Sequence, residues 1–134
     1  MKLKPKNSEG TNFELVGDFM EAFGQTVEID PTWPDFNTRD LRLELISEEF
    51  SELCQAMEDR DMIQIADALT DLLYVVYGAG HTFGLDLDEC FQEVHSSNMS
   101  KLGEDGRPLH REDGKVLKGP NFFEPDLESI LGAL

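Results

Sequence analysis

The sequence predicts an all-α fold: a bundle of four to five helices followed by a short hairpin or loop as a C-terminal tail. Apolar residues recur at the helical period of 3.6 in successive segments. These segments are separated by capping residues, glycines and prolines, which begin and end helices. The chain has 134 residues, the size of one domain, so we expect a single domain over 1–134. Within it, residues 1–10 form a flexible lead-in and residues 103–134 a tail that packs on the bundle.

The first two helices follow from caps and periodicity. Residues 13–23 place their apolar side chains at helical spacing, with Thr11-Asn12 as a cap before them and Gly24 as a stop behind them. Residues 25–37 contain two prolines and form a loop. A second helix is expected from caps at Asn37 and Thr38 through about residue 58. Its apolar stripe consists of Leu43, Ile46, Phe50, Leu53, Cys54 and Met57.

The third helix is expected at about 62–83, after a short polar turn, and it ends at Gly84. It is apolar nearly all round, which predicts burial on most sides. A fourth helix begins at a cap, Asp86 or Asp88, and runs to about residue 102. The turn dipeptides at 105–106 and 113–114 favour a small hairpin or ordered loop, and a last helical segment is expected at 127–134.

Composition excludes several classes of function. The formal net charge is -17, from 28 acidic and 11 basic residues, so the chain repels nucleic acid and anionic membranes. The longest apolar run, 72–79, is far shorter than the roughly 20 residues of a membrane helix. The polar, Lys-rich start is no signal peptide, and Cys54 and Cys90 are expected to be reduced in a cytoplasm. A phosphate substrate would require a bound cation, and five of the eleven bases lie between 101 and 118.

Asp67 and Asp71 are the unusual residues of the third helix. They are one helical turn apart and therefore point the same way. Their neighbours in sequence are apolar, and no Lys or Arg occurs between Arg60 and Lys101. Carboxylates in a mostly buried helix are costly unless they are paired or bind a metal.

Acids of the second helix complement this pair. Glu48, Glu49 and Glu52 lie within about one turn, with Glu49 at the edge of the apolar stripe. A short turn makes the two helices antiparallel, so Glu52 comes level with Asp67, and Glu48 with Asp71. A Mg²⁺ site explains such convergence; the alternative is a solvated acidic face. A di-iron centre is disfavoured because Glu-x-x-His pairs are absent.

These residues resemble a known group, the all-α NTP pyrophosphatases, which include MazG, dimeric dUTPases and phosphoribosyl-ATP pyrophosphohydrolase. The similarity lies in Glu49-x-x-Glu52, in Asp71 within the segment 67–76, and in the segments 94–102 and 113–120. It runs from about Leu41 to Pro125 and is closest to a MazG-like branch of the phosphoribosyl-ATP pyrophosphohydrolase-like proteins. The chain departs from the usual Glu-x-x-Glu … Glu-x-x-Asp signature at Ala68, where the family has Glu, and this puts the number of metal ions in doubt.

The resemblance implies a MazG-like bundle that binds Mg²⁺, with Mn²⁺ as a substitute. It places Glu49, Glu52 and Asp71 as metal ligands, and Asp67 is the candidate to replace the missing Glu. Glu48 is the candidate base that orients the attacking water. Candidate substrate-binding residues are Asn98, Lys101, Lys115, Lys118 and Trp33. Their alternative roles are helix C-terminal capping for Asn98 and Lys101, a solvated hairpin for the two later lysines, and core or lid packing for Trp33.

The activity thus expected is hydrolysis of a (d)NTP to a (d)NMP and pyrophosphate. Members of this group assemble as dimers or tetramers, and we expect a homodimer or homotetramer in the cytoplasm, without nucleic-acid or membrane partners. Two alternatives within the group are a phosphoribosyl-ATP pyrophosphohydrolase and a dUTPase. From another class, the alternative is a non-catalytic helical dimerisation or regulatory module.

Overall fold

The computed structural model describes residues 9–132 and 134, so most of the expected flexible lead-in lies outside the described residues. The fold is all-α, as predicted, and no strand occurs among the described residues. The chain divides into two compact units, one up to Asp86 and one from Leu87 to Leu134. The first unit contains α1 (Asn12–Ala22), α2 (Phe36–Glu58) and α3 (Met62–Phe83); the second contains α4 (Leu87–Met99) and α5 (Leu127–Leu131). The predicted packing of 103–134 on the bundle stays a prediction.

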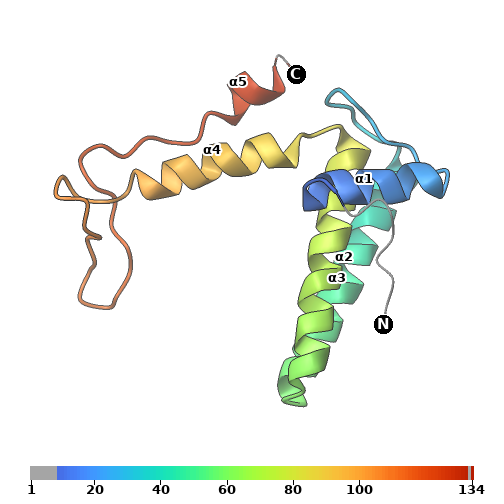
Figure 1. Cartoon of the computed structure of the whole chain (residues 1–134), viewed down its shortest axis with the longest axis horizontal. Coiled ribbons are helices and arrows are strands. Elements are labelled where there is room, and N and C mark those ends of the chain that lie inside the picture. The colour runs from blue at the N-terminus through green and yellow to red at the C-terminus, as the bar shows by residue number, and fades with distance from the viewer. Residues whose placement is uncertain (1–8, 133) are drawn as a thin grey trace. The chain divides into compact units, whose positions relative to one another are not determined.

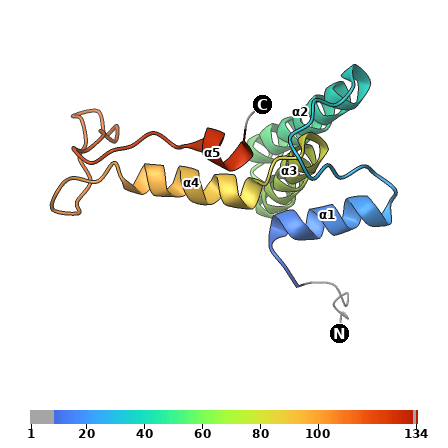
Figure 2. The same cartoon turned by 90° about the horizontal axis from the view of Figure 1, so that it is seen from above.

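Helices α2 and α3 form an antiparallel hairpin, and α1 packs across α3 (Figures 1 and 2). Thr11 caps α1 with a capping box: its hydroxyl accepts from the Glu14 N–H, and the Glu14 carboxylate accepts from the Thr11 N–H. His81 joins α1 to α3. Its ring is buried, stacks on Phe13 at 3.8 Å and forms a 2.7 Å hydrogen bond with the Phe13 carbonyl through Nε2.

The ends of α2 and α3 are set by aspartates and by backbone conformation. The cap of α2 is Asp35, whose carboxylate accepts a hydrogen bond from the Thr38 N–H at 2.8 Å. The prediction of Asn37 and Thr38 as caps is therefore wrong by two to three residues. Asp61 caps α3 in the same manner. Gly84 ends α3 in the left-handed conformation at φ 68°, and a Cβ there would lie 2.0 Å from the Asp30 carbonyl oxygen, so only glycine fits.

The predicted burial of α2 and α3 is only partly found in the single chain. On α2 the apolar stripe includes buried Leu53, but Leu43, Phe50 and Met57 are 60%, 56% and 54% exposed. On α3 only Ala68 and the segment near its C-terminal end are buried. The expectation that α3 is buried on most sides is therefore wrong for this chain by itself, because α1 and α2 cover too little of its surface.

Helix α3 is long and apolar enough, by length and composition, to cross a membrane, with a mean hydropathy of 1.2 over its best window. One such helix is weak evidence, since core helices of soluble proteins have the same composition. Asp67 and Asp71 lie within this helix, and a carboxylate in a bilayer core costs several kcal/mol. The apolar surface is therefore better suited to protein than to lipid.

The second unit consists of α4, α5 and the connecting segment. Helix α4 ends at Met99, earlier than the predicted end near residue 102. The predicted hairpin is present as one antiparallel bridge between His110 and Val116, with Gly114 in its turn at φ 86°. The Ser97 hydroxyl, buried on α4, donates to the Phe123 carbonyl at 2.8 Å and holds the returning chain against the helix.

Candidate active site

Three carboxylates from the two facing helices lie together in the α2–α3 hairpin. Glu49 and Glu52 are three residues apart on α2, so they share one face of that helix. Asp71 reaches the same point from α3, and one oxygen of each of the three residues lies within 4.8 Å of the others. Glu49 and Asp71 are half-buried, whereas Glu52 is exposed. These three residues are called the carboxylate cluster below.

The electrostatics of the cluster disfavour three negative charges. Desolvation raises the pKa of Glu49, and the charges of Glu52 and Asp71 raise it further. Desolvation likewise raises the pKa of Asp71, with the charges of Asp67 and Glu52 as the next causes. Within residues 9–132, the ion pairs of the structure are Arg39–Asp40, Arg111–Asp113 and Lys118–Glu124, so no base neutralises the cluster.

The cluster has the donor set of a hard metal ion. All its ligand atoms are carboxylate oxygens, which Mg²⁺ prefers. The Oε2 atom of Glu49 is buried and has no hydrogen-bond partner among the described residues. An unpartnered buried anion is costly, and a bound divalent cation would remove that cost. The residues present therefore fit a divalent cation, which Glu49, Glu52 and Asp71 could hold.

Asp67 and Glu48 take different positions beside the cluster. Asp67 is exposed and close enough to raise the pKa values of Glu49 and Asp71. With Glu52 and Ala68 it lines a depression of about 280 Å³ toward the turn end of the hairpin. Glu48 is exposed and lies outside the carboxylate cluster. The prediction from helix geometry that Glu48 lies level with Asp71 is therefore wrong, and Glu49 takes that place beside Asp71. Ala68 is buried and leaves the family's usual second Glu without a counterpart at that position.

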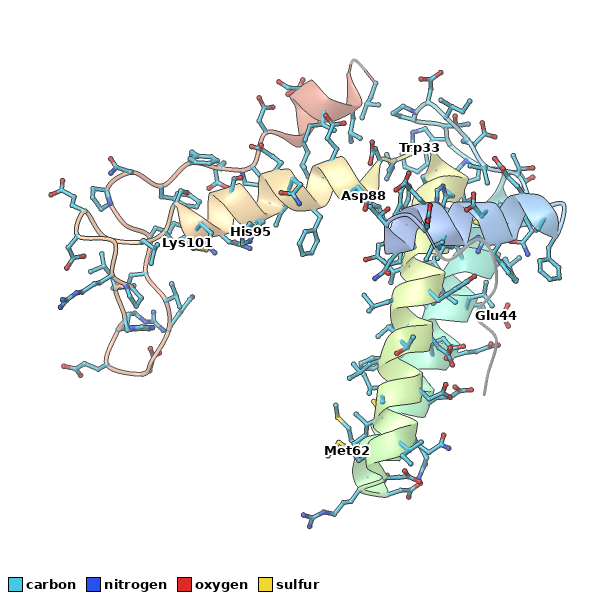
Figure 3. All side chains as sticks on the ribbon, in the orientation of Figure 1. Trp33, Glu44, Met62, Asp88, His95 and Lys101 are labelled. Carbon is cyan, nitrogen blue, oxygen red and sulfur yellow. The ribbon has the colours of Figure 1, made fainter. Side chains whose placement is uncertain are left out.

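Trp33 lies in the segment before α2 (Figure 3) and is not part of the carboxylate cluster. It is 85% exposed, with its ring edge-on to Phe83 at 5.9 Å, so the core-packing alternative is excluded in the single chain. It lines a cleft of about 570 Å³, together with residues of the 24–35 loop, the N-terminal half of α2 and Thr82. This cleft is called the α2 cleft below.

Arg42, which also lines the α2 cleft, was not among the predicted site residues. The signal for it was present in the sequence: Arg42 precedes Glu49 by seven residues, two helical turns, and so lies on the same face of α2. An isolated arginine on a helix is usually solvated, and the spacing alone did not single it out.

The four remaining predicted substrate-binding residues belong to the second unit. Asn98 is exposed near the end of α4, and Lys101 follows it in the turn, where the Lys101 carbonyl accepts from the Gly119 N–H at 2.8 Å (Figure 3). Lys115 is exposed in the hairpin. Lys118 lies 3.7 Å from the Glu124 carboxylate and 4.6 Å from the centre of the Phe122 ring. The structure thus gathers these residues in one unit, and their role toward a substrate stays a prediction.

Comparison with known proteins finds a family and a curated relative that are similar in sequence. The sequence model of the phosphoribosyl-ATP pyrophosphohydrolase family matches residues 16–98, more than half of the chain. "Uncharacterized protein L479" of Acanthamoeba polyphaga mimivirus is 37% identical over 129 residues, covering 92% of this chain and 48% of that protein. The chain therefore spans about half the length of this curated relative.

A solved structure shares the fold. The crystal structure of a "putative NTP pyrophosphohydrolase" from Exiguobacterium sp. 255-15 superimposes with a TM-score of 0.50 at 24% identity, covering 91% of this chain and 94% of that one. The all-α fold is thus shared with this solved structure, and the family match supplies the class. The chain belongs to the phosphoribosyl-ATP pyrophosphohydrolase family, and this membership supports a pyrophosphohydrolase function.

Proposed function

We propose that this chain hydrolyses nucleoside triphosphates to monophosphates and pyrophosphate with Mg²⁺, which Mn²⁺ can replace. The observation that carries the proposal is the carboxylate cluster, whose buried Glu49 oxygen has no hydrogen-bond partner, and whose acids form no ion pair, among the described residues. Glu49, Glu52 and Asp71 would hold the ion, and Asp67 borders it. A bound divalent ion supplies neutralisation of triphosphate charge and a water of lowered pKa.

The residues of the chain then divide the remaining work. Glu48, exposed beside the cluster, is proposed to accept the proton of the attacking water while remaining free of metal. Trp33 offers an exposed ring on which a base can stack. Asn98, Lys101, Lys115 and Lys118 are proposed to contact substrate, with the lysines meeting phosphate oxygens.

The exposed apolar surface supports the proposal of a homodimer or homotetramer. On α2, Leu43, Phe50 and Met57 follow each other at intervals of seven residues, and on α3 so do Met62, Leu69 and Val76. Residues seven apart share a helix face, and all six side chains are between 38% and 76% exposed. Two such stripes on neighbouring helices are the surface that a helical partner covers in a bundle. A second copy of the chain is the partner that is always present with it.

One observation favours a second candidate substrate. The family model that matches the chain is that of phosphoribosyl-ATP pyrophosphohydrolase, so phosphoribosyl-ATP belongs beside the common nucleotides. Cleavage of either substrate releases pyrophosphate, and the same carboxylates would serve both reactions.

The test is a substrate panel. The purified protein is incubated with each NTP and dNTP, including dUTP, and with phosphoribosyl-ATP, in Mg²⁺ or in EDTA, and the products are separated by anion exchange. We expect monophosphate and pyrophosphate to form in Mg²⁺ only. The rate should fall about 100-fold or more in Glu52→Gln and in Asp71→Asn, because each lacks one metal ligand. Glu44→Gln, which removes an exposed acid from α2, should keep the wild-type rate. Turnover in EDTA, or full activity of both ligand variants, would overturn the proposal.

A further inference from the structure

Arg42 is a half-buried cation that forms no ion pair with any residue the structure describes. Its Nη2 donates to the Gln25 side chain at 3.4 Å, the outer limit of a hydrogen bond, and its Nε is buried with no partner among the described residues. Desolvation by burial lowers its pKa, with no neighbouring charge as a cause. Leaving a buried charge unpaired is unfavourable. The net charge of the chain is -17, so the missing counter-ion is not due to a shortage of acidic residues.

A second arginine on the same helix shows the ordinary arrangement. Arg39 pairs with Asp40 at 3.2 Å and lies over the Phe36 ring at 4.2 Å. The Arg39 Nε also has no hydrogen-bond partner in the part of the chain that the structure describes, but the Asp40 carboxylate compensates the Arg39 charge. Arg39 does not line the α2 cleft, whereas Arg42 does. The contrast indicates that the Arg42 guanidinium is held for something other than an internal ion pair.

The fold keeps the Arg42 guanidinium at the wall of the cleft. Gly78 of α3 faces it: a Cβ at that position would lie 2.9 Å from Nη1. Arg42 also borders a smaller cavity of about 120 Å³ on its α1 side, so the guanidinium lies between the two spaces. Along α2, seven residues separate it from Glu49, a rise of about 10 Å on one face. A nucleotide whose phosphates lie at the carboxylate cluster would have its base at a similar distance from the cluster.

The lining of the α2 cleft suits a base better than a phosphate. It offers the exposed Trp33 ring and the aliphatic Leu41 and Leu45, with hydroxyl groups around them. It also contains the acids Glu28 and Asp35, which repel phosphate but accept hydrogen bonds from an amino group. The Asp35 carboxylate is engaged as the cap of α2. The Glu28 carboxylate has no hydrogen bond or ion pair to any other side chain that the structure describes.

We propose that the α2 cleft takes the base of the substrate and that Arg42 selects it, an inference that rests on the proposed function. A guanidinium presents parallel N–H donors and pairs best with two adjacent acceptors on one edge of a base. Guanine offers O6 and N7, and cytosine offers O2 and N3. Adenine and uracil offer no such adjacent pair. The exocyclic amino group of guanine or cytosine, like that of adenine, can donate a hydrogen bond to the Glu28 carboxylate.

The test measures base preference in binding and in turnover. Guanosine, cytidine, adenosine and uridine are titrated into the protein in EDTA by calorimetry, and kcat/KM is measured for the four triphosphates in Mg²⁺. The wild-type protein should prefer guanine or cytosine, and the nucleoside titrations and the kcat/KM values show which of the two. Arg42→Met should lower that preference by about 5- to 100-fold and leave values for the other bases within about twofold. Arg39→Met, the matched control, should keep the preference.

Equal loss for all four bases in Arg42→Met would overturn the inference, because it would mean a structural role. So would an unchanged preference, or a wild-type protein that prefers adenine or uracil. Gly78→Ala leaves Arg42 in place but displaces its guanidinium, and it should lower the same preference even where Arg42→Met fails to fold. Nucleoside binding in EDTA requires neither metal nor hydrolysis, so it judges this inference separately when no nucleotide is turned over.

Discussion

Neutralising Glu49 should stabilise the metal-free protein. In the carboxylate cluster, Glu49 faces two other acids with oxygens within 4.8 Å. Unit charges at that distance repel by about 1 kcal/mol in bulk water and by about 3.5 kcal/mol at an effective dielectric constant of about 20. Because Glu52 is exposed and the other two are half-buried, the lower figure applies to each pair. Two pairs then give about 2 kcal/mol for Glu49→Gln.

For a chain of this length, that gain corresponds to a rise in Tm of about 5–10 °C. Tm is measured by differential scanning fluorimetry in EDTA at pH 8, where the acids are ionised. It is measured again in about 10 mM Mg²⁺, because an ion that binds only the folded state raises Tm. The wild type should gain stability from Mg²⁺, and Glu49→Gln should lose most of that gain. The variant is thus more stable than the wild type without metal and less responsive with it.

Glu44→Gln is the matched control, because it removes the same charge from an exposed position of α2 (Figure 3). It changes the net charge of the protein equally but leaves the cluster intact. If both variants shift Tm by the same amount in EDTA, the effect is one of net charge, and the argument from local repulsion fails. A Mg²⁺ response that survives in Glu49→Gln would refute Glu49 as a ligand.

Three further outcomes are expected. In EDTA the ionised Asp71 destabilises the folded protein at a pH above its raised folded-state pKa and has no such effect below its ordinary pKa of 3.8. The free energy of unfolding of the wild type, relative to that of Asp71→Asn, should therefore fall as the pH rises between these two pKa values. Urea unfolding from pH 4 to 8 measures this difference, and a difference that does not change with pH would show that the pKa of Asp71 is unperturbed. Gly84→Ala should lower the free energy of unfolding by several kcal/mol, because the new Cβ would collide with the Asp30 carbonyl oxygen. Gly24→Ala should lower it by about 1 kcal/mol, because Gly24 also has a positive φ but a Cβ there has no atom within 4 Å. Equal losses in urea unfolding would contradict the collision with Asp30. Phe50→Glu with Leu69→Glu should convert an oligomer to a monomer in light scattering, and an unchanged mass would exclude those stripes as the interface.

The helices and the carboxylate cluster could be predicted because both depend on local rules. Helical spacing places Glu49 beside Glu52, and the short polar turn at 59–61 makes α2 and α3 antiparallel. The turn by itself sets Asp71 level with Glu48, and the family resemblance places Asp71 with Glu49 and Glu52. The Gly84 stop followed from its freedom at positive φ. These features need no knowledge of what surrounds the helices.

The remaining features depend on surroundings that periodicity does not contain. The apolarity of α3 shows that its surface is suited to burial but not which chain covers it, so Leu69 and Ile63 are exposed here. Asp35, Asn37 and Thr38 are all good caps, and the path of the preceding loop decides among them. Arg42 became notable only when its missing partner and the α2 cleft could be seen.

The most direct test of the central claim is ³¹P NMR of one nucleoside triphosphate during incubation with the protein and Mg²⁺. The account predicts resonances of the monophosphate and of pyrophosphate in equal amounts, appearing with the wild type and not with Asp71→Asn. Resonances of a diphosphate and orthophosphate would show that a different bond is cut. An unchanged spectrum with every nucleotide and with phosphoribosyl-ATP would mean that the carboxylate cluster does not serve pyrophosphohydrolysis.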